Sequence, residues 1–274
     1  MEAIQLFQQS KLDAALEAQT RALRQKPADI DLRYAMAGLL AAAGEFDRAL
    51  VHLDFIAAEV PALATAVAMY VSSLHAEEER RRIYEQGHVP GTDPENEVFV
   101  RRRVRLLQAV AANDAAAAES AATEIAAEPV PAASVDGGAP APFRDLDDGL
   151  GALLELFVGG RCLWVPTANL RSLEFTPPRG LLDLLYAQCA IVTRTGTRYA
   201  AHVPVRYAGS QSHPEPEVRC GRRTEWEDRL GVAFRGFGQR VFAVGDGASG
   251  GRELGILELA QLGSGQVTFP AGEA

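Results

Sequence analysis

The strongest constraint on the fold is a repeat with an offset of 34 residues near the start of the chain. The stretch from Leu12 to Pro27 aligns with the stretch from Phe46 to Pro61. The matching pairs are Asp13 and Asp47, Ala15 and Ala49, Leu16 and Leu50, and Pro27 and Pro61. This offset is the period of tetratricopeptide repeats, in which each unit is a pair of antiparallel helices. The sequence therefore predicts stacked helical repeats.

The second copy of the repeat carries residues with clear mechanical roles. Gly44 suits the turn between two helices, small Ala49 lets the helices approach closely, and Pro61 ends the second helix. Further helical stretches are expected at 61–87, 96–110 and 113–127. Residues 1–128 are accordingly expected to form an all-helical, tetratricopeptide-like domain.

The first helices of such repeats line the concave face of the stack, and this predicts a groove. Small residues around Tyr34 leave room there for a partner helix or peptide. The predicted groove residues are Asp31, Tyr34, Gly38, Ala41, Ala42, Thr65, Ala68, Ser72, His75 and Ala76. The alternative is that these positions pack against the second half of the chain, and both possibilities stay open.

A segment rich in Ala, Pro and Gly separates two kinds of sequence. Residues 129–142 have a composition that cannot build a core, so they are expected to be a linker. Residues 143–274 are expected to form a second domain rich in strands. Strands are predicted at 162–165, 190–193, 199–204, 232–235, 240–244 and 254–259, and helices at 143–157 and 181–187. The fold class is therefore α+β, with helical repeats followed by a mixed, mainly antiparallel β domain that contains one or two helices.

Charge and cysteine usage argue against several kinds of partner. The net charge of −9 disfavours a phosphate backbone, so no nucleic-acid partner is expected. The arginines at 80–82 and 101–105 are interpreted, with the glutamates at 77–79, as a solvated helix face. Three widely spaced cysteines indicate neither a disulfide framework nor zinc. With no signal-peptide pattern and no apolar run of the ~20 residues that span a membrane, we expect a cytoplasmic protein without membrane contact.

No residue pattern predicts catalysis, a cofactor or a metal site. Gly245–Gly250 spells GxGxxG, but more glycines follow it in place of the helix that a nucleotide site needs, so a surface loop is expected. The carboxylates of Asp145, Asp147 and Asp148 are interpreted as capping a helix and not as metal ligands. A non-enzymatic protein is therefore expected.

An enzyme remains the alternative, because catalytic residues converge in space and not in sequence. Its site would lie in the β-rich domain around Asp147, Asp183, His202 and Arg223. A general tetratricopeptide scaffold for some other assembly is the other alternative.

Several short segments of the second half follow one another in a characteristic order. They are FRDLDD at 143–148, LWVP at 163–166, LLDLLYAQCAIVTRTG at 181–196, VPVRYAGS at 203–210, GRRTEW at 221–226 and GFGQRVFAVGD at 236–246. This order, behind the helical repeats, resembles the TagJ/ImpE family of type VI secretion accessory proteins. The likeness covers nearly the whole chain.

The resemblance implies a cytoplasmic, non-enzymatic adaptor without a cofactor. Members of that family bind the N-terminal helix of TssB, the small subunit of the contractile sheath, which implies a role in sheath assembly or recycling. The site is expected either in the groove around Tyr34 or, in the second half, at Trp164, Tyr207, Arg223 and Trp226. Core packing and an internal ion pair are the alternative for these last four residues.

Overall fold

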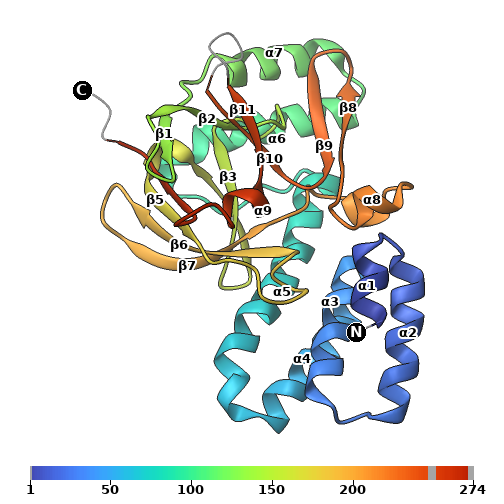
Figure 1. Cartoon of the computed structure of the whole chain (residues 1–274). Coiled ribbons are helices and arrows are strands. Elements are labelled where there is room, and N and C mark those ends of the chain that lie inside the picture. The colour runs from blue at the N-terminus through green and yellow to red at the C-terminus, as the bar shows by residue number, and fades with distance from the viewer. Residues whose placement is uncertain (1, 246–250, 271–274) are drawn as a thin grey trace.

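The computed structural model describes residues 2–245 and 251–270, and it joins a helical first half to a large β-sheet (Figure 1). The helices of the first half are α1 (Glu2–Gln8), α2 (Leu12–Gln25), α3 (Ile30–Ala42), α4 (Phe46–Glu59), α5 (Ala64–Gln86), α6 (Glu97–Ala111) and α7 (Ala115–Ala126), with short 3-10 turns η1 (Pro61–Leu63) and η2 (Pro94–Asn96). Within the described residues, none of the helices is long and apolar enough to cross a membrane. The predicted α+β class is confirmed.

The repeat is visible in the helix boundaries. α2 begins at Leu12 and α4 at Phe46, and both helices are 14 residues long. Gly44 reverses the chain between α3 and α4 with a φ of +80°, a conformation that glycine adopts without steric cost. Consecutive helices from α1 to α5 pack against one another. The helical repeats predicted from the 34-residue offset are therefore present.

Helix α5 connects the repeats to the sheet. It packs against α4 on one side and against β3 and β4 on the other, and in Figure 1 it runs between the two halves of the molecule. The helix ends at Gly87, whose left-handed backbone has a φ of +66°. Its length fits this double contact, because a short helix would not reach both layers.

The strands of the second half form one large antiparallel sheet. They are β1 (Ala132–Val135), β2 (Ala141–Asp145), β3 (Leu153–Val158), β4 (Arg161–Pro166), β5 (Leu170–Phe175), β6 (Tyr186–Thr193), β7 (Arg198–Pro204), β10 (Val241–Val244), β11 (Arg252–Gly255) and β12 (Gln266–Thr268). Their order is β11-β10-β2-β1-β12-β5-β6-β7-β3-β4. β8 (Thr224–Arg229) and β9 (Ala233–Gly238) form a separate hairpin. Short helices α8 (Pro216–Arg219) and α9 (Ile256–Leu259) and the 3-10 turns η3 (Thr167–Asn169) and η4 (Ser210–Ser212) complete this half.

The segment 129–142 is not the structureless linker expected from its composition. It holds β1 and the start of β2, and Ala133 and Val135 are buried in the sheet core. Small side chains suit this position, because backbone hydrogen bonds to β12 hold β1 in place and need no bulky residues. The domain boundaries drawn from that composition stay a prediction.

The predictions of two helices in the second half are wrong. Residues 143–157 form the end of β2, a turn and most of β3, and residues 181–187 form a turn and the start of β6. Along β3 the residues from Leu153 to Phe157 are all buried, so the strand lacks the alternation that separates strands from helices in a sequence. The predicted strand at 254–259 ends early, because α9 begins at Ile256.

The strands predicted at 190–193, 199–204, 232–235 and 240–244 are confirmed. β6 pairs with β7 across the turn at Gly196, and β9 and β10 occupy the predicted runs at 232–235 and 240–244. The glycine-rich loop expected at 245–250 lies, beyond Gly245, outside the described residues.

One apolar core crosses the junction between the two halves. Leu39 and Leu40 of α3 belong to the same buried cluster as Phe157, Trp164 and Tyr186 of the sheet. A second cluster fills the interior of the sheet. A third joins α6 and α7 to Ala233 of β9, so these last helices pack on the β-rich half. The helical repeats are thus continuous with the rest of the molecule.

Candidate functional site

Part of the predicted groove is covered by the second half of the chain. Gly38 lies directly under Leu181, whose Cγ would be 2.8 Å from a Cβ at that position. The carbonyl oxygens of Ala41 and Ala42 accept hydrogen bonds from the Arg206 guanidinium at 3.3 and 2.8 Å. Gly38 and Ala41 therefore follow the alternative considered for the groove residues, in which they pack within the molecule.

Tyr34, the predicted aromatic anchor, also makes internal contacts. Its half-buried ring packs edge-on against Tyr70, with 6.0 Å between centroids, and lies close to Gly180. The Tyr70 hydroxyl donates a hydrogen bond to Asp183, which also accepts from the backbone N–H groups of Arg179 and Gly180. This contact fastens the turn before β6 onto α3 and α5.

Most of the remaining groove residues lie along a surface that is still open, whereas Ala76 is buried. Asp31, Thr65 and His75 are exposed, and Ser72 is half-buried. A Cβ placed on Gly160, at the turn between β3 and β4, would lie 3.8 Å from the Cβ of His75. His75 therefore marks the point where the open surface of α5 meets the sheet.

An open pocket of about 890 Å³ begins at this point. It lies between the repeat helices α4 and α5, the β3–β4 turn and η4. Phe46, Leu50 and Leu74 supply apolar side chains, and both signs of charge stand around them. The lining residues are Ala43, Gly44, Phe46, Asp47, Leu50, Leu74, His75, Glu78, Glu79, Arg81, Arg82, Gly160, Arg161, Gln211 and Ser212. We refer to this pocket as the repeat pocket.

A buried network of charges holds one wall of the repeat pocket in place. Glu155 of β3 accepts from Arg80 of α5 at 2.7 Å and from Arg240 at 2.8 Å. Arg240 also binds Asp145 at 2.6 Å. All four side chains are almost completely buried. Because α5 contributes Arg80, the network fixes the helix to the sheet.

The network is arranged so that Glu155 stays ionised. Burial by itself raises the pKa of its carboxyl, but Arg80 and Arg240 outweigh burial and hold the pKa below its usual value. At Asp145 burial dominates, so that its pKa is raised despite the contact with Arg240. Glu155 is therefore the central anion of the junction.

Trp164 and Tyr207 belong to this network and are not on the surface. The Trp164 indole N–H donates to Glu155 at 3.1 Å, and the Tyr207 hydroxyl donates to Asp145 at 2.7 Å. Arg223 is exposed and forms ion pairs with Glu217 and Glu225. Trp164 and Tyr207 thus pack in the core, as in the alternative considered for them, whereas the ion pairs of Arg223 lie at the surface.

Trp226 is the aromatic member of that group with an open face. It is 40% exposed on β8, and its ring lies 5.7 Å from that of Tyr207. Close by, a smaller pocket of about 180 Å³ opens between α6 and β9. Phe234, which is 52% exposed, stands at this pocket, and buried Asp147 lines it. We refer to it as the hairpin pocket.

Of the four residues of the enzyme alternative, Asp183 and His202 lie close to each other, because both contact Tyr70. Asp147 accepts from the backbone N–H of Gly236 at 3.0 Å, whereas His202 shares a 2.6 Å hydrogen bond with Ser73 and Asp183 binds Tyr70. Arg223 forms exposed ion pairs with Glu217 and Glu225. Across residues 2–245 and 251–270, no group of three or more His, Cys, Asp or Glu side chains is placed to hold a metal ion.

The buried charges of the network are not predicted from the sequence, although one residue pattern indicates them. Arg80 was interpreted as part of a solvated face, but it continues the helical spacing of the buried residues Tyr70, Ser73 and Ile83. A buried arginine needs hydrogen-bond acceptors, and Glu155, within a run of apolar strand residues, is a candidate for a buried carboxylate. Which carboxylate meets which arginine was not readable from the sequence.

Comparison with known proteins gives three findings. The sequence model of the ImpE protein family matches residues 137–261. The type VI secretion system accessory component TagJ of Pseudomonas aeruginosa is 31% identical over 265 residues, which cover 96% of this chain and 90% of that protein. The crystal structure of protein VPA1032 from Vibrio parahaemolyticus superposes with a TM-score of 0.84 at 20% identity, covering 99% of this chain and 98% of that one, and supports the fold.

Proposed function

The chain belongs to the TagJ/ImpE family of type VI secretion accessory components, and on this basis we propose that it is a non-enzymatic adaptor of the contractile sheath. Its partner in this proposal is the N-terminal helix of the small sheath subunit, TssB. Binding takes place in the cytoplasm and modulates assembly or recycling of the sheath.

The observation that carries this proposal is the repeat pocket. Phe46 and Leu50 of α4 and Leu74 of α5 offer an apolar floor between two helices of the repeat. An amphipathic helix binds such a floor with side chains spaced three and four residues apart. The pocket has a volume of about 890 Å³ and is open to solvent, so one face of a helix can lie in it.

The charges around the floor support a helix with a mixed polar face. Glu78 and Glu79 stand on α5 beside Arg81 and Arg82, and Arg161 approaches from the β3–β4 turn. Exposed charge pairs contribute little affinity but fix orientation and register. The affinity therefore comes from the apolar floor, and we expect a dissociation constant in the micromolar range, or about −8 kcal/mol.

A calorimetric titration tests the proposal. A synthetic peptide that copies the N-terminal helix of the cognate TssB is titrated into the full chain. The variant Leu50→Asp places a charge on the apolar floor, and Val51→Asp is its matched control, because Val51 follows on the same helix and is 63% exposed outside the pocket. We expect Leu50→Asp to weaken binding by at least about tenfold and Val51→Asp to leave it unchanged.

A second variant shows whether binding is lost without any folding defect, which Leu50→Asp could introduce. His75→Trp fills the repeat pocket from an exposed position and leaves the core alone. It should abolish binding while the thermal midpoint stays near that of the unmodified chain. Absence of heat with the unmodified chain would contradict the adaptor proposal. Loss of binding in Trp226→Ala but not in His75→Trp would move the site to the hairpin pocket.

A further inference from the structure

A third pocket lies on the polar face of the sheet, away from the repeat helices, and has a volume of about 770 Å³. Its floor is a row of directly opposed residues that crosses five strands. The row runs from β1 to β7 through Ser134, Thr268, Ser172, Val192 and Arg198. The neighbouring residues on the other face, such as Val135, Val267 and Leu173, are buried. The sheet therefore presents polar side chains outward at this place.

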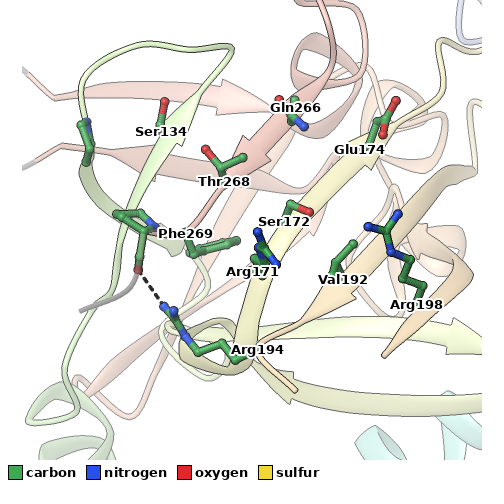
Figure 2. A pocket seen from close by; sticks show the side chains of 12 residues that line it. Ser134, Arg171, Ser172, Glu174, Val192, Arg194, Arg198, Gln266, Thr268 and Phe269 are labelled. Carbon is green, nitrogen blue, oxygen red and sulfur yellow. Dashed lines mark hydrogen bonds between the residues drawn. The ribbon is translucent and has the colours of Figure 1, made fainter. Parts of the chain in front are cut away.

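A β-bulge adds a further arginine to the pocket. The pairing of β5 with β6 shifts between Leu170 and Ser172, so that Arg171 is an extra residue without a partner. A bulge re-aims the side chain of the inserted residue and often occurs next to functional sites. Arg171 lines the pocket together with Ser172, although adjacent residues of a regular strand point to opposite faces. Figure 2 shows both side chains at the same place.

The arginines of the pocket are not neutralised by the described carboxylates. Arg171, Arg194 and Arg198 form no ion pair within residues 2–245 and 251–270, and neither does Glu174, the acidic residue that also lines the pocket. By contrast, Arg81 and Arg101 on the helices are each paired with nearby glutamates. In a chain with a net charge of −9, this pocket is a local concentration of positive charge.

The three arginines are spread along the pocket and do not converge on one point. Arg194 stands at one end, where it donates to the backbone oxygens of Ala168 and Pro270, the latter at 3.0 Å. Figure 2 shows Arg198 at the other end and Arg171 between them. The hydroxyls of Ser172 and Thr268, which also line the pocket, make no hydrogen bond to the described side chains or backbone. Such a row offers several separate anion contacts.

We propose that this pocket binds an acidic segment of a protein partner, whose carboxylates pair with Arg171 and Arg198. Guanidinium groups match carboxylates with two parallel hydrogen bonds, and the free hydroxyls donate to the oxygens that remain. The spread of the arginines favours several carboxylates on an extended chain over one small anion. This site is separate from the repeat pocket and does not depend on helix binding there.

Fluorescence anisotropy tests the proposal with a short labelled peptide that alternates glutamate and serine, at low ionic strength. The double variant Arg171→Ala/Arg198→Ala removes two arginines of the pocket. The matched control, Arg24→Ala/Arg222→Ala, removes the same charge from two exposed arginines that have no described ion pair and lie outside the pocket. We expect the pocket variant to weaken binding by at least about tenfold and the control by less than about twofold. Added salt should weaken binding by the unmodified chain and the control alike, and binding by the pocket variant less.

The outcomes separate this proposal from its rivals. No binding, or an equal loss in both double variants, would overturn it, because the second result reports only net charge. Displacement of the peptide by equimolar inorganic phosphate would also overturn it in favour of a single small anion. The TssB helix peptide should bind the pocket variant as it binds the unmodified chain, so failure of one proposal leaves the other standing.

Discussion

The single carboxylate of Glu155 forms ion pairs with two arginines that lie far apart in the chain. Burial of such charges is unfavourable unless each is paired and hydrogen-bonded, and here Arg80, Arg240 and the Trp164 indole together surround the anion. The Tyr70 ring stacks on His202 at 5.2 Å and adds a second polar contact between α5 and β7, beside the Ser73 hydrogen bond. Individual buried polar residues thus hold the helical half on the sheet.

Replacing Glu155 tests the network at this scale. Glu155→Gln keeps the shape of the side chain but leaves the Arg80 guanidinium without its buried counter-charge. We expect the free energy of unfolding to fall by about 3 kcal/mol. Denaturant titration measures it, with Glu119→Gln as the control because Glu119 is exposed on α7 and forms no described ion pair. An equal change in both variants would show that the network contributes no stability.

His202 predicts a pH dependence of stability. Burial lowers the pKa of its imidazole from 6.5 to about 4. The unfolded chain therefore takes up a proton below about pH 6.5 while the folded chain does not, and stability falls as the pH drops from there towards 4 by up to about 3 kcal/mol. His202→Gln should lose this component when urea unfolding is compared at about pH 7 and pH 5.

Asp147 changes stability with pH in the opposite direction, so its contribution must be separated from that of His202. Burial, with Asp145 nearby, raises its pKa from 3.8 to about 6, so the folded chain binds this proton more tightly and gains stability as the pH falls through 6. The difference between the unmodified chain and His202→Gln cancels the Asp147 contribution. A difference that does not change with pH would contradict the buried, neutral state of His202.

At the scale of elements, α3 packs against the turn before β6 at a point where only a hydrogen atom fits. Gly38 interrupts a helix of otherwise good helix formers, where glycine costs about 1 kcal/mol relative to alanine. The close approach of Leu181 accounts for it, because its Cβ, Cγ and Cδ2 lie within 3.0 Å of a Cβ at this position. At this position the close packing of the two halves takes precedence over helix propensity.

A double-mutant cycle measures this contact. Gly38→Ala alone should destabilise the chain by about 1–3 kcal/mol, since overpacking outweighs the gain in helix propensity. Leu181→Ala alone should also destabilise it, because it leaves a cavity. Together the two changes should cost less than their sum, because the added methyl group occupies space that the leucine vacates. Strict additivity of the unfolding free energies would contradict the close packing.

At the scale of the molecule, the two halves share one apolar core. Residues of α3, α5, β3 and β4 belong to a single buried cluster, and α6 and α7 pack on β9. A core cut at residue 128 would expose apolar surface on both fragments. The described structure therefore favours one cooperative unit over two independent domains.

Unfolding of the full chain should show this cooperativity. Far-ultraviolet circular dichroism reports chiefly on the helices, whereas both tryptophans of the chain, Trp164 and Trp226, lie in the second half. We expect the two signals to change at the same denaturant concentration, as in a two-state transition. Separate midpoints would show that the repeats unfold independently of the sheet.

The sequence by itself determined the elements whose signal is local or periodic. The 34-residue offset predicted the helices, the runs at 190–193 and 199–204 predicted strands β6 and β7, and the ordered segments of the second half indicated the family. Only the tertiary structure decided that Gly38 and Ala41 are covered, that the Ala-rich segment joins the sheet, and that Arg80 meets Glu155. These features depend on contacts between residues far apart in the chain, and burial and partner choice become visible only when such residues are brought together.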